Sequence, residues 1–413
     1  MTATVHLRPG HVQPIWAGHP WVYAQAIARV EGNRPEPGDI VRVIDPQGRL
    51  LGRGFWSPRQ AIPVRLFSRD DDTDLESPDW LIERLRSALR RRRAVGLPDV
   101  DTNGYRLMHA EGDDVPGLVI DRFGTDEEGR GGVVVVQAGT AGLRRRANLL
   151  LTAMREVLDP VSILDRTPIT VAKGEGFELD DKLNFGAPVS VLSFRERGLA
   201  FEIPTELAQK TGFYFDQRQL RSRVESLARG RRVLDAYCYV GPIALSAARG
   251  GAASVLALDD SLRALEVGAQ CARLNGLSIR FERADVRQEL PKLAAAGEKF
   301  GLVILDPPKL APKRGDRDNA IAYQTRLVEQ AAAVVEQGGI MIVCSCSTAL
   351  GSSELARSLA IGARRAGRSA TVLERLSQGA DHPVPAAFPE GIYLSTLIAE
   401  LSGSLPTNAP NRD

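Results

Sequence analysis

Cysteine is rare in this sequence, and long apolar runs are missing. The 413 residues include four cysteines, all in the C-terminal half and without the paired spacing of a zinc site or a disulfide framework. The sequence therefore predicts free thiols in a reducing compartment. No stretch of about twenty apolar residues occurs, and the N-terminus, MTATVHLRPG, lacks the apolar segment of a signal peptide. We expect a cytoplasmic protein that does not span a membrane.

A strong excess of one charge is also missing. The formal net charge of +2 is too small to indicate nucleic-acid binding by itself. Of the 53 basic residues seven are lysine and 46 are arginine. Arginine suits contacts with phosphates and base faces, but the base composition of the genome can also explain such an excess, and we favour the genomic explanation. The length predicts two or three domains, and a hydrophobic content of 43% is enough for more than one core.

The segment from residue 231 to residue 260 reads RRVLDAYCYVGPIALSAARGGAASVLALDD. An apolar run ends at Asp235, a turn contains Gly241, a helical pattern follows from Ile243, and a second apolar run ends at Asp259. This order predicts the first β-α-β unit of a doubly wound parallel sheet, whose ligand lies outside the carboxyl ends of the strands. Because the Asp259 carboxylate can accept hydrogen bonds from a ribose diol, we expect a nucleoside ligand.

The turn of this unit lacks the glycines of a dinucleotide site. A pyrophosphate needs several close backbone amides and hence the pattern G-x-G-x-x-G, whereas this turn has one glycine followed by Pro242, which has no N–H. The turn therefore favours S-adenosylmethionine, which has no phosphate, and its spacing resembles motif I of class I methyltransferases. A unit that binds another ligand, or none, is the alternative. The residues expected to bind the cofactor here are Asp235, Tyr239, Gly241 and Asp259.

Two later strand patterns end in reactive groups. Phe300 to Leu305 leads into the sequence D-P-P-K from Asp306, and Ile340 to Val343 leads into C-S-C-S. Because parallel strands point the same way, both ends belong at the same edge as Asp235. The D-P-P-K sequence resembles motif IV of nucleic-acid methyltransferases, in which the acid grips a flipped base. Amino-group methyltransferases usually have an aromatic residue after the prolines; Lys309 stands there, which disfavours transfer to an exocyclic amine.

Cys346 in the C-S-C-S sequence predicts covalent chemistry. Carbon 5 of cytosine is a poor nucleophile, but a thiolate that adds to carbon 6 makes carbon 5 able to accept a methyl group; loss of the carbon-5 proton then expels the cysteine. Asp306 is the expected partner of the cytosine ring nitrogen and amine as charge builds there. We therefore predict Cys346 and Asp306 as catalytic residues that form 5-methylcytosine.

The alternative for each cysteine is a place in the core, where most strand cysteines lie. Cys344 would share a face with Cys346 on an extended strand. If the strand ends at Ser345, however, only Cys346 reaches the loop, so we predict Cys344 as a core residue. Cys238 and Cys271 are also assigned to packing.

Nine stretches of the sequence resemble a known family. They are HPWVY (19–23), YRLMHAEGDDVPGLVIDRFG (105–124), DRTPITVAKGEG (165–176), QKTGFYFDQR (209–218), VLDAYCYVG (233–241), DPPK (306–309), SCS (345–347), ADHP (380–383) and PEGIYL (389–394). They resemble the bacterial three-domain cytosine-5 methyltransferases of large-subunit ribosomal RNA that carry an N-terminal PUA domain. The resemblance implies a class I fold, S-adenosylmethionine as methyl donor, Cys346 as nucleophile and large-subunit ribosomal RNA as partner.

Two positions depart from the resembling families. Pro242 stands where a second glycine is common. Related cytosine methyltransferases often carry a further cysteine just after motif IV that helps to release the product, whereas this chain has Lys309 and Leu310. Product release must then use another base.

The expected fold class is α/β, with a C-terminal doubly wound class I methyltransferase sheet preceded by two small domains. Residues 1–72 are predicted as a small β-barrel, which the resemblance identifies as a PUA-like RNA-binding domain. Residues 73–190 are predicted as a helix plus a small α+β domain, with a helix from about Leu143 to Val157 and a strand from Thr170 to Ala172. Residues 191–402 are predicted as the methyltransferase domain and 403–413 as a disordered tail.

Aromatic and arginine side chains in the N-terminal part allow two interpretations. Trp16, Trp21, Tyr23 and Trp56 could stack on bases, but such aromatics more often fill the core of a small barrel, and we favour that assignment. The predicted helix from Trp80 to Val95 carries arginines around an apolar face, and these either face phosphates or form a solvated surface.

Residues 209–218 precede the helix that leads into the nucleotide-binding unit. In the resembling family this segment closes over the cofactor, so the resemblance implies Arg218 at the methionine carboxylate and Phe213 or Tyr214 near adenine. The alternative is a helix cap formed by Asp216. Asp285, which follows the third strand of the sheet, is expected to accept a hydrogen bond from the adenine amine.

The sequence thus predicts an S-adenosylmethionine-dependent enzyme that methylates carbon 5 of a cytosine in large-subunit ribosomal RNA. Direct transfer to guanine or adenine is one alternative, and a ribosome-assembly factor that binds RNA without catalysis is another. Homodimer formation is left open, because the sequence does not decide the oligomeric state.

Overall fold

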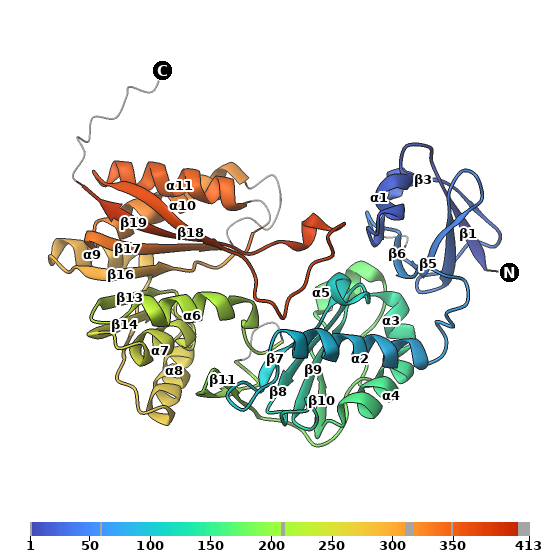
Figure 1. The fold of residues 1–413 in the computed structure, drawn as a ribbon, viewed down its shortest axis with the longest axis horizontal. Coiled ribbons are helices and arrows are strands. Elements are labelled where there is room, and N and C mark those ends of the chain that lie inside the picture. The colour runs from blue at the N-terminus through green and yellow to red at the C-terminus, as the bar shows by residue number, and fades with distance from the viewer. Residues whose placement is uncertain (1, 58–59, 208–210, 310–316, 348–349, 404–413) are drawn as a thin grey trace. The chain divides into compact units, whose positions relative to one another are not determined.

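The computed structural model describes residues 2–57, 60–207, 211–309, 317–347 and 350–403, and the chain forms two compact units (Figure 1). Unit 1 contains Met1–Gly198, Ile203–Phe215 and Ala380–Gly391. Unit 2 contains Leu199–Glu202, Asp216–Gly379 and Ile392–Asp413. Residues 404–413 of the predicted tail 403–413, and residues 310–316 after the D-P-P-K sequence, lie outside the described residues.

The N-terminal part of unit 1 is a six-stranded mixed sheet with the strand order β2-β6-β5-β4-β1-β3. Its elements are β1 (Ala3–Leu7), α1 (Val12–Trp16), β2 (Trp21–Val22), β3 (Ile27–Glu31), β4 (Ile40–Ile44), β5 (Leu50–Trp56) and β6 (Val64–Ser68). Alternate residues of β1 point into the core, as its apolar spacing predicts. The assignment of all four aromatics to the core is wrong for Trp16, whose side chain is 76% exposed at the end of α1.

A four-stranded sheet of order β10-β9-β8-β7 follows in unit 1. Its elements are α2 (Asp79–Ala94), β7 (Gly104–His109), β8 (Leu118–Phe123), β9 (Val133–Ala138), α3 (Ala141–Arg145), α4 (Ala147–Leu158), β10 (Ser162–Asp165) and α5 (Ile169–Glu175). The chain then enters β11 (Val191–Glu196) and β12 (Leu199–Pro204), and the boundary between the units falls within β12. Helix α2 matches its prediction to within one residue at each end.

Two expectations for this sheet are wrong. The helix expected from Leu143 is broken at Arg146, whose buried guanidinium donates to the Gly38 carbonyl at 2.9 Å and lies over the Phe55 ring. The strand expected from Thr170 to Ala172 lies inside helix α5. Glu175, the last residue of this helix, is buried, and its carboxylate accepts hydrogen bonds from Ser57 and Arg65 at 2.7 and 2.8 Å. These tertiary contacts outweigh the strand propensity of the β-branched residues in α5.

Unit 2 is built on a seven-stranded sheet of order β15-β14-β13-β16-β17-β19-β18. Its strands are β13 (Arg232–Ala236), β14 (Ser254–Asp259), β15 (Arg280–Arg283), β16 (Phe300–Leu305), β17 (Val335–Ser345), β18 (Ser369–Leu376) and β19 (Ser395–Ser402). The strands from β15 to β17 run parallel, and β19 runs antiparallel to both of its neighbours. The order of the first strands reverses at β13, which confirms the doubly wound arrangement.

Helices cover both faces of this sheet (Figure 1). Its helices are α6 (Arg218–Leu227), α7 (Pro242–Arg249), α8 (Leu262–Leu274), α9 (Val286–Ala295), α10 (Arg317–Ala332) and α11 (Ser352–Arg365). The first three pack on one face and the last three on the other. Every residue of β16 is buried between these layers, which accounts for its continuous apolar sequence. Among the described residues no helix is long and apolar enough to cross a membrane.

Candidate active site at the carboxyl edge of the unit 2 sheet

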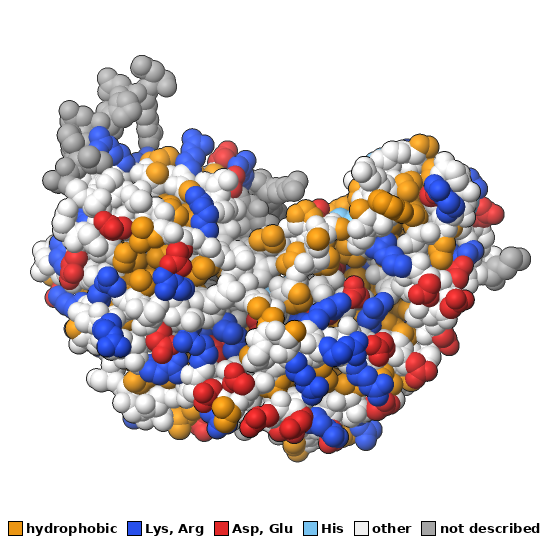
Figure 2. All heavy atoms as spheres, viewed as in Figure 1, with side chains coloured by type: hydrophobic (Ala, Val, Ile, Leu, Met, Phe, Trp, Pro, Cys, Tyr) orange, Lys and Arg blue, Asp and Glu red, His pale blue; other side chains and the backbone are white. Residues whose placement is uncertain are grey.

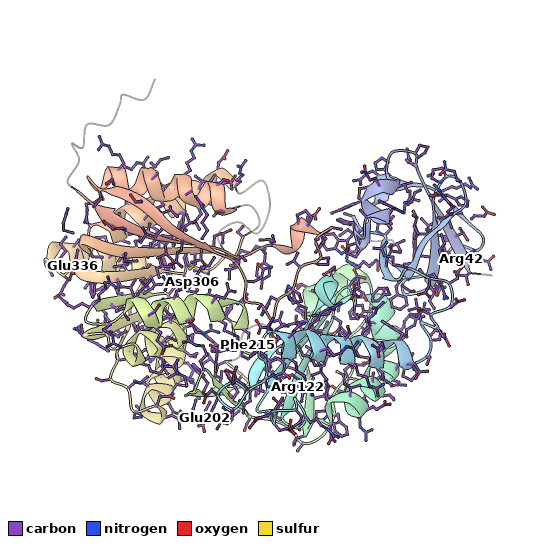
Figure 3. All side chains as sticks on the ribbon, in the orientation of Figure 1. Arg42, Arg122, Glu202, Phe215, Asp306 and Glu336 are labelled. Carbon is purple, nitrogen blue, oxygen red and sulfur yellow. The ribbon has the colours of Figure 1, made fainter. Side chains whose placement is uncertain are left out.

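The polar residues predicted for the site lie at the carboxyl ends of the parallel strands. They are Asp235 in β13, Asp259 at the end of β14, Asp285 two residues after β15, Asp306 directly after β16 and Cys346 directly after β17. Figure 3 labels Asp306 at this end of the sheet and Glu336, near the start of β17, at the opposite end. The shared direction of the strands therefore brings residues more than one hundred positions apart to a single edge.

The turn after β13 has an unusual backbone. Tyr237, Tyr239 and Gly241 adopt positive φ angles of 68°, 53° and 69°. Positive φ is costly for tyrosine, so the surrounding structure must enforce this conformation. The Phe281 ring from β15 packs under the turn: a Cβ atom on Gly241 would lie 2.7 Å from it. Glycine is therefore required at this position both by conformation and by space.

Asp235 is fully buried, and neither of its carboxyl oxygens makes a hydrogen bond of normal geometry with the described residues. Burial, with a smaller contribution from the negative charge of Asp306, raises the pKa of Asp235 to about 8, although the Ala244 amide in the first turn of α7 acts the other way. The side chain is therefore mostly protonated at neutral pH. A buried acid without a partner is suited to bind a cationic group of a ligand, because that group would restore its charged form.

Asp259 fixes the turn from the neighbouring strand. Its carboxylate accepts hydrogen bonds from the backbone amides of Tyr239 at 2.8 Å and Ser261 at 3.0 Å. Burial raises the pKa of Asp259, while these two amides partly offset the effect. The role of Tyr239 seen here is thus a backbone contact that orients the acid predicted to bind a ribose.

Asp285 has a different environment. It caps helix α9, accepts from the Arg287 amide at 3.0 Å and pairs with the Arg287 guanidinium at 2.7 Å, which lowers the pKa of Asp285. It lines a cavity of about 420 Å³ together with Tyr323 and Arg326. The Tyr323 hydroxyl lies 3.5 Å from the hydroxyl of Tyr237, so this cavity adjoins the turn after β13.

Asp306 has a partner that the sequence did not reveal. The Gln217 side-chain amide donates to its carboxylate at 2.7 Å, and Gln217 is the residue that precedes α6. Gln217 therefore occupies the N-cap position that the sequence had offered to Asp216, and it makes no side-chain cap. The only signal in the sequence was the position of Gln217 within the segment 209–218.

Cys346 is the one cysteine of the four that is not buried. Cys344 is fully buried and accepts a hydrogen bond from the Thr396 hydroxyl at 3.5 Å, which confirms its assignment to the core. Cys238 and Cys271 are also buried, as predicted. Burial raises the pKa of each of these three thiols, so none of them is activated as a thiolate.

The remaining predicted cofactor residues lie in different units. Arg218 begins α6 in unit 2 and is half-buried. Phe213 belongs to unit 1, where it is 2% exposed and packs at ring-centroid distances of 5.0 Å from Phe194 and 5.2 Å from Phe215. The structure therefore shows Phe213 as part of an aromatic cluster in unit 1.

Ion pairs engage the arginines of helix α2. Arg86 pairs with Glu156 at 3.1 Å, and Arg91 pairs with Asp114 at 2.8 Å. Arg92 is buried and pairs with Asp113 at 2.7 Å. Figure 2 shows basic side chains over α2 with acidic side chains beside them. These pairs favour the structural interpretation of the arginine-rich helix over a free phosphate-binding face.

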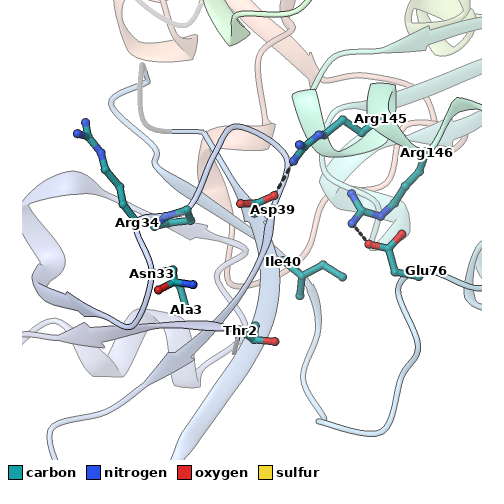
Figure 4. Close-up of a pocket in the computed structure, with 10 residues that line it drawn as sticks. Thr2, Ala3, Asn33, Arg34, Asp39, Ile40, Glu76, Arg145 and Arg146 are labelled. Atoms are coloured by element: carbon teal, nitrogen blue, oxygen red, sulfur yellow. Dashed lines mark hydrogen bonds and ion pairs between the residues drawn. The ribbon is translucent and has the colours of Figure 1, made fainter.

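A cavity of about 700 Å³ in unit 1 contains none of the predicted site residues (Figure 4). It lies between the N-terminal sheet and the junction of α3 and α4. Two arginines at this junction are paired: Arg145 bonds Asp39 at 2.6 Å, and Arg146 bonds Glu76. These two pairs tie the junction to neighbouring segments of unit 1.

Replacement of Asp235 by asparagine should change stability in a pH-dependent way. The folded-state pKa near 8 lies above the unfolded value of about 3.9, so the folded chain holds an extra proton between these values and loses stability as the pH rises. Asp235→Asn removes this loss. We expect the melting temperature of the variant, relative to the native chain, to increase from pH 6 to pH 9. The exposed neighbour Asp260→Asn is the control, and a pH-independent difference for Asp235→Asn would contradict the assignment.

Comparisons with known proteins agree with this geometry. Residues 5–69 match the model of a PUA-like domain, and residues 180–392 match the model of S-adenosylmethionine-dependent methyltransferases. Ribosomal RNA large subunit methyltransferase I of Erwinia tasmaniensis is 35% identical over 95% of this chain and 98% of its own length. The protein of the same name from Aeromonas hydrophila is 34% identical over 96% of this chain and 99% of its own length.

Two crystal structures share the fold. A methyltransferase solved in complex with SAH superposes with a TM-score of 0.81 at 17% identity, over 97% of this chain and 100% of its own. A protein described as a SAM-dependent methyltransferase from Streptococcus mutans superposes with a TM-score of 0.79 at 16% identity over the same shares. The family-model match and the two relatives show that the chain belongs to the S-adenosylmethionine-dependent methyltransferases, in the family of the ribosomal RNA large subunit methyltransferases I.

Proposed function

We propose that the protein methylates carbon 5 of a cytosine in large-subunit ribosomal RNA through a transient bond to Cys346. The observation that carries this proposal is that Cys346 is the one cysteine of the four that is not buried. Cys346 directly follows β17, and the neighbouring strand β16 is directly followed by Asp306. A nucleophile must be accessible to the base, and Cys346 meets this requirement whereas the three buried cysteines do not.

The chemistry assigns one role to each group. The Cys346 thiolate forms a bond to carbon 6 of the cytosine, and carbon 5 then gains enough electron density to take the methyl group. The carbon-5 proton leaves to a base, and the electron pair of that C–H bond re-forms the double bond as the carbon–sulfur bond breaks. The Asp306 carboxylate holds the cytosine amine and ring nitrogen while charge develops on the ring.

The residues at the edge also fit S-adenosylmethionine, which supplies an electrophilic methyl group when bound. The buried acid Asp235 makes no hydrogen bond of normal geometry with the described residues, which suits it to the methionine ammonium. Asp259 is oriented to accept from the ribose hydroxyls, and Asp285 lines a cavity that can receive the adenine edge. Tyr239 and Gly241 shape the turn. Arg218 at the methionine carboxylate and Phe213 near adenine remain proposals that the family resemblance supplies.

Large-subunit ribosomal RNA is the proposed substrate because the relatives that match nearly the whole chain carry that substrate in their names. The PUA-like match over residues 5–69 supports an RNA-binding role for the proposed domain 1–72. We propose 73–190 as a second domain and 191–402 as the catalytic domain.

The tight packing at Gly241 predicts a loss of cofactor binding in Gly241→Ala. The new Cβ would meet Phe281 at 2.7 Å and distort the turn. Gly276→Ala is a matched control, since Gly276 has a similar φ of 64° but open space around it. We expect Gly241→Ala to weaken S-adenosylmethionine binding by about tenfold or more, a change of about 1.4 kcal/mol, and Gly276→Ala to leave it unchanged by calorimetry. Equal affinities for the two variants would contradict the assigned cofactor turn.

Cys344, in β17, and Cys346, directly after it, provide the test of the covalent route. Cys346→Ala should lower the rate of 5-methylcytosine formation by several orders of magnitude, because the ring is not activated without the thiolate. Cys344→Ala should keep the rate while lowering the melting temperature, because Cys344 is a buried packing residue. The product is mapped by sequencing bisulfite-treated ribosomal RNA after incubation with S-adenosylmethionine.

Two outcomes would overturn the proposal. Activity retained by Cys346→Ala, with the methyl group on guanine or adenine, would indicate direct transfer. A chain that binds ribosomal RNA but shows no S-adenosylmethionine binding by calorimetry would indicate a non-catalytic assembly factor.

A further inference from the structure

Gln217 makes a contact whose place in unit 2 suggests a role in catalysis. Its side chain is only 7% exposed, and its amide nitrogen lies 2.7 Å from an Asp306 carboxylate oxygen. Residues 217 and 306 are 89 positions apart, so this hydrogen bond is a tertiary contact and not a local turn. It ties the start of α6 to the end of β16.

The segment that carries Gln217 is itself held in place by residues next to the last two strands of the sheet. The backbone carbonyl of Asp216 accepts from the Gly379 amide at 2.8 Å, and the Asp216 carboxylate accepts from the Tyr393 hydroxyl at 2.7 Å. Gly379 follows β18 and Tyr393 precedes β19. Asp216 is 5% exposed, so both hydrogen bonds are shielded from water and are worth more than surface contacts.

We propose that Gln217 is a positioning residue that holds the Asp306 carboxylate in the orientation needed to grip the target base. The inference rests on the proposed function, because it takes Asp306 as the group that contacts the cytosine. An amide carries no net charge, so the contact fixes the direction of the carboxylate without neutralising it. The hydrogen bonds of Asp216 with Tyr393 and Gly379 hold this segment in place. The Gln217 amide therefore keeps its position if the Asp306 carboxylate rotates.

The orientation of the Asp306 carboxylate affects the free energy of the transition state more than it affects the binding of S-adenosylmethionine. A carboxylate that is free to rotate must be ordered again each time the cytosine ring accumulates charge, and that cost appears in the rate. The S-adenosylmethionine contacts proposed for Asp235, Asp259 and Arg218 use side chains other than that of Gln217, and a substitution at Gln217 leaves these side chains in place. Loss of the amide should therefore lower kcat for RNA and leave the Kd for S-adenosylmethionine unchanged.

Gln217→Glu gives the sharper test because it keeps the shape and changes the charge. Two carboxyl groups at hydrogen-bond distance cannot both ionise cheaply, so the pair takes up a proton and one of its pKa values rises. At low pH the shared proton re-forms the hydrogen bond, and at high pH the two charges repel. The variant should therefore be more active relative to the native chain at pH 6 than at pH 8.

The experiment measures kcat and KM for ribosomal RNA from pH 6 to pH 9, together with the Kd for S-adenosylmethionine and the melting temperature. We expect Gln217→Ala to lose at least tenfold in kcat at all pH values, and Gln217→Glu to lose at least tenfold at pH 8 with partial recovery at pH 6. Both variants should bind S-adenosylmethionine within twofold of the native chain. Gln270→Ala is the matched control, because Gln270 makes an exposed amide–carboxylate contact with Glu202 in the same unit.

A pH profile of Gln217→Glu that superposes on the native profile would overturn the positioning role, and so would a loss of activity that follows only from weaker cofactor binding or a lower melting temperature. These outcomes are separate from failure of the proposed function. That failure is seen in the native chain, as a methylated product other than 5-methylcytosine.

Discussion

Parallel pairing of neighbouring strands is the constraint from which the site follows. β13, β14, β16 and β17 run in one direction, so their carboxyl ends lie at the same edge of the sheet. This rule brings Asp306 and Cys346, which directly follow β16 and β17, to the edge at which Asp235 lies near the end of β13. A one-residue change in where β17 ends would exchange the thiol for a hydroxyl, because Cys346 is the first residue beyond the strand.

The same edge brings carboxyl groups together at a cost in stability. Asp235 is buried near Asp306 and has no hydrogen bond of normal geometry among the described residues. Other buried acids are paired closely with arginine, as for Asp113 with Arg92 and Glu175 with Arg65 in unit 1. Because unpaired buried acids are expensive and tend to mark functional sites, this contrast supports the proposal that Asp235 binds a ligand.

Much of unit 2 could be predicted from the sequence because its signals are local. β16 was predicted with the observed bounds, since a fully buried strand has a continuous apolar run. A strand that ends at Ser345 places Cys344 in the core and Cys346 in the loop, and the structure confirms both positions. The failures involve tertiary contacts: α5 is a helix although its sequence is β-branched, because Glu175 is anchored on the N-terminal sheet. The contact of Gln217 could not be predicted for the same reason. Its partner Asp306 lies 89 positions away, and the sequence does not distinguish a buried glutamine from an exposed one.

The central claim is that Cys346 bonds to the target base, and a trapping experiment tests it most directly. Ribosomal RNA that contains 5-fluorocytosine has no carbon-5 proton to lose, so methyl transfer should leave the enzyme attached to the RNA. The account predicts a methylated RNA adduct on the peptide that contains Cys346, identified by mass spectrometry, with the Cys344 sulfur of the same peptide unmodified. No adduct at Cys346, from an enzyme that still methylates the unsubstituted RNA, would contradict it.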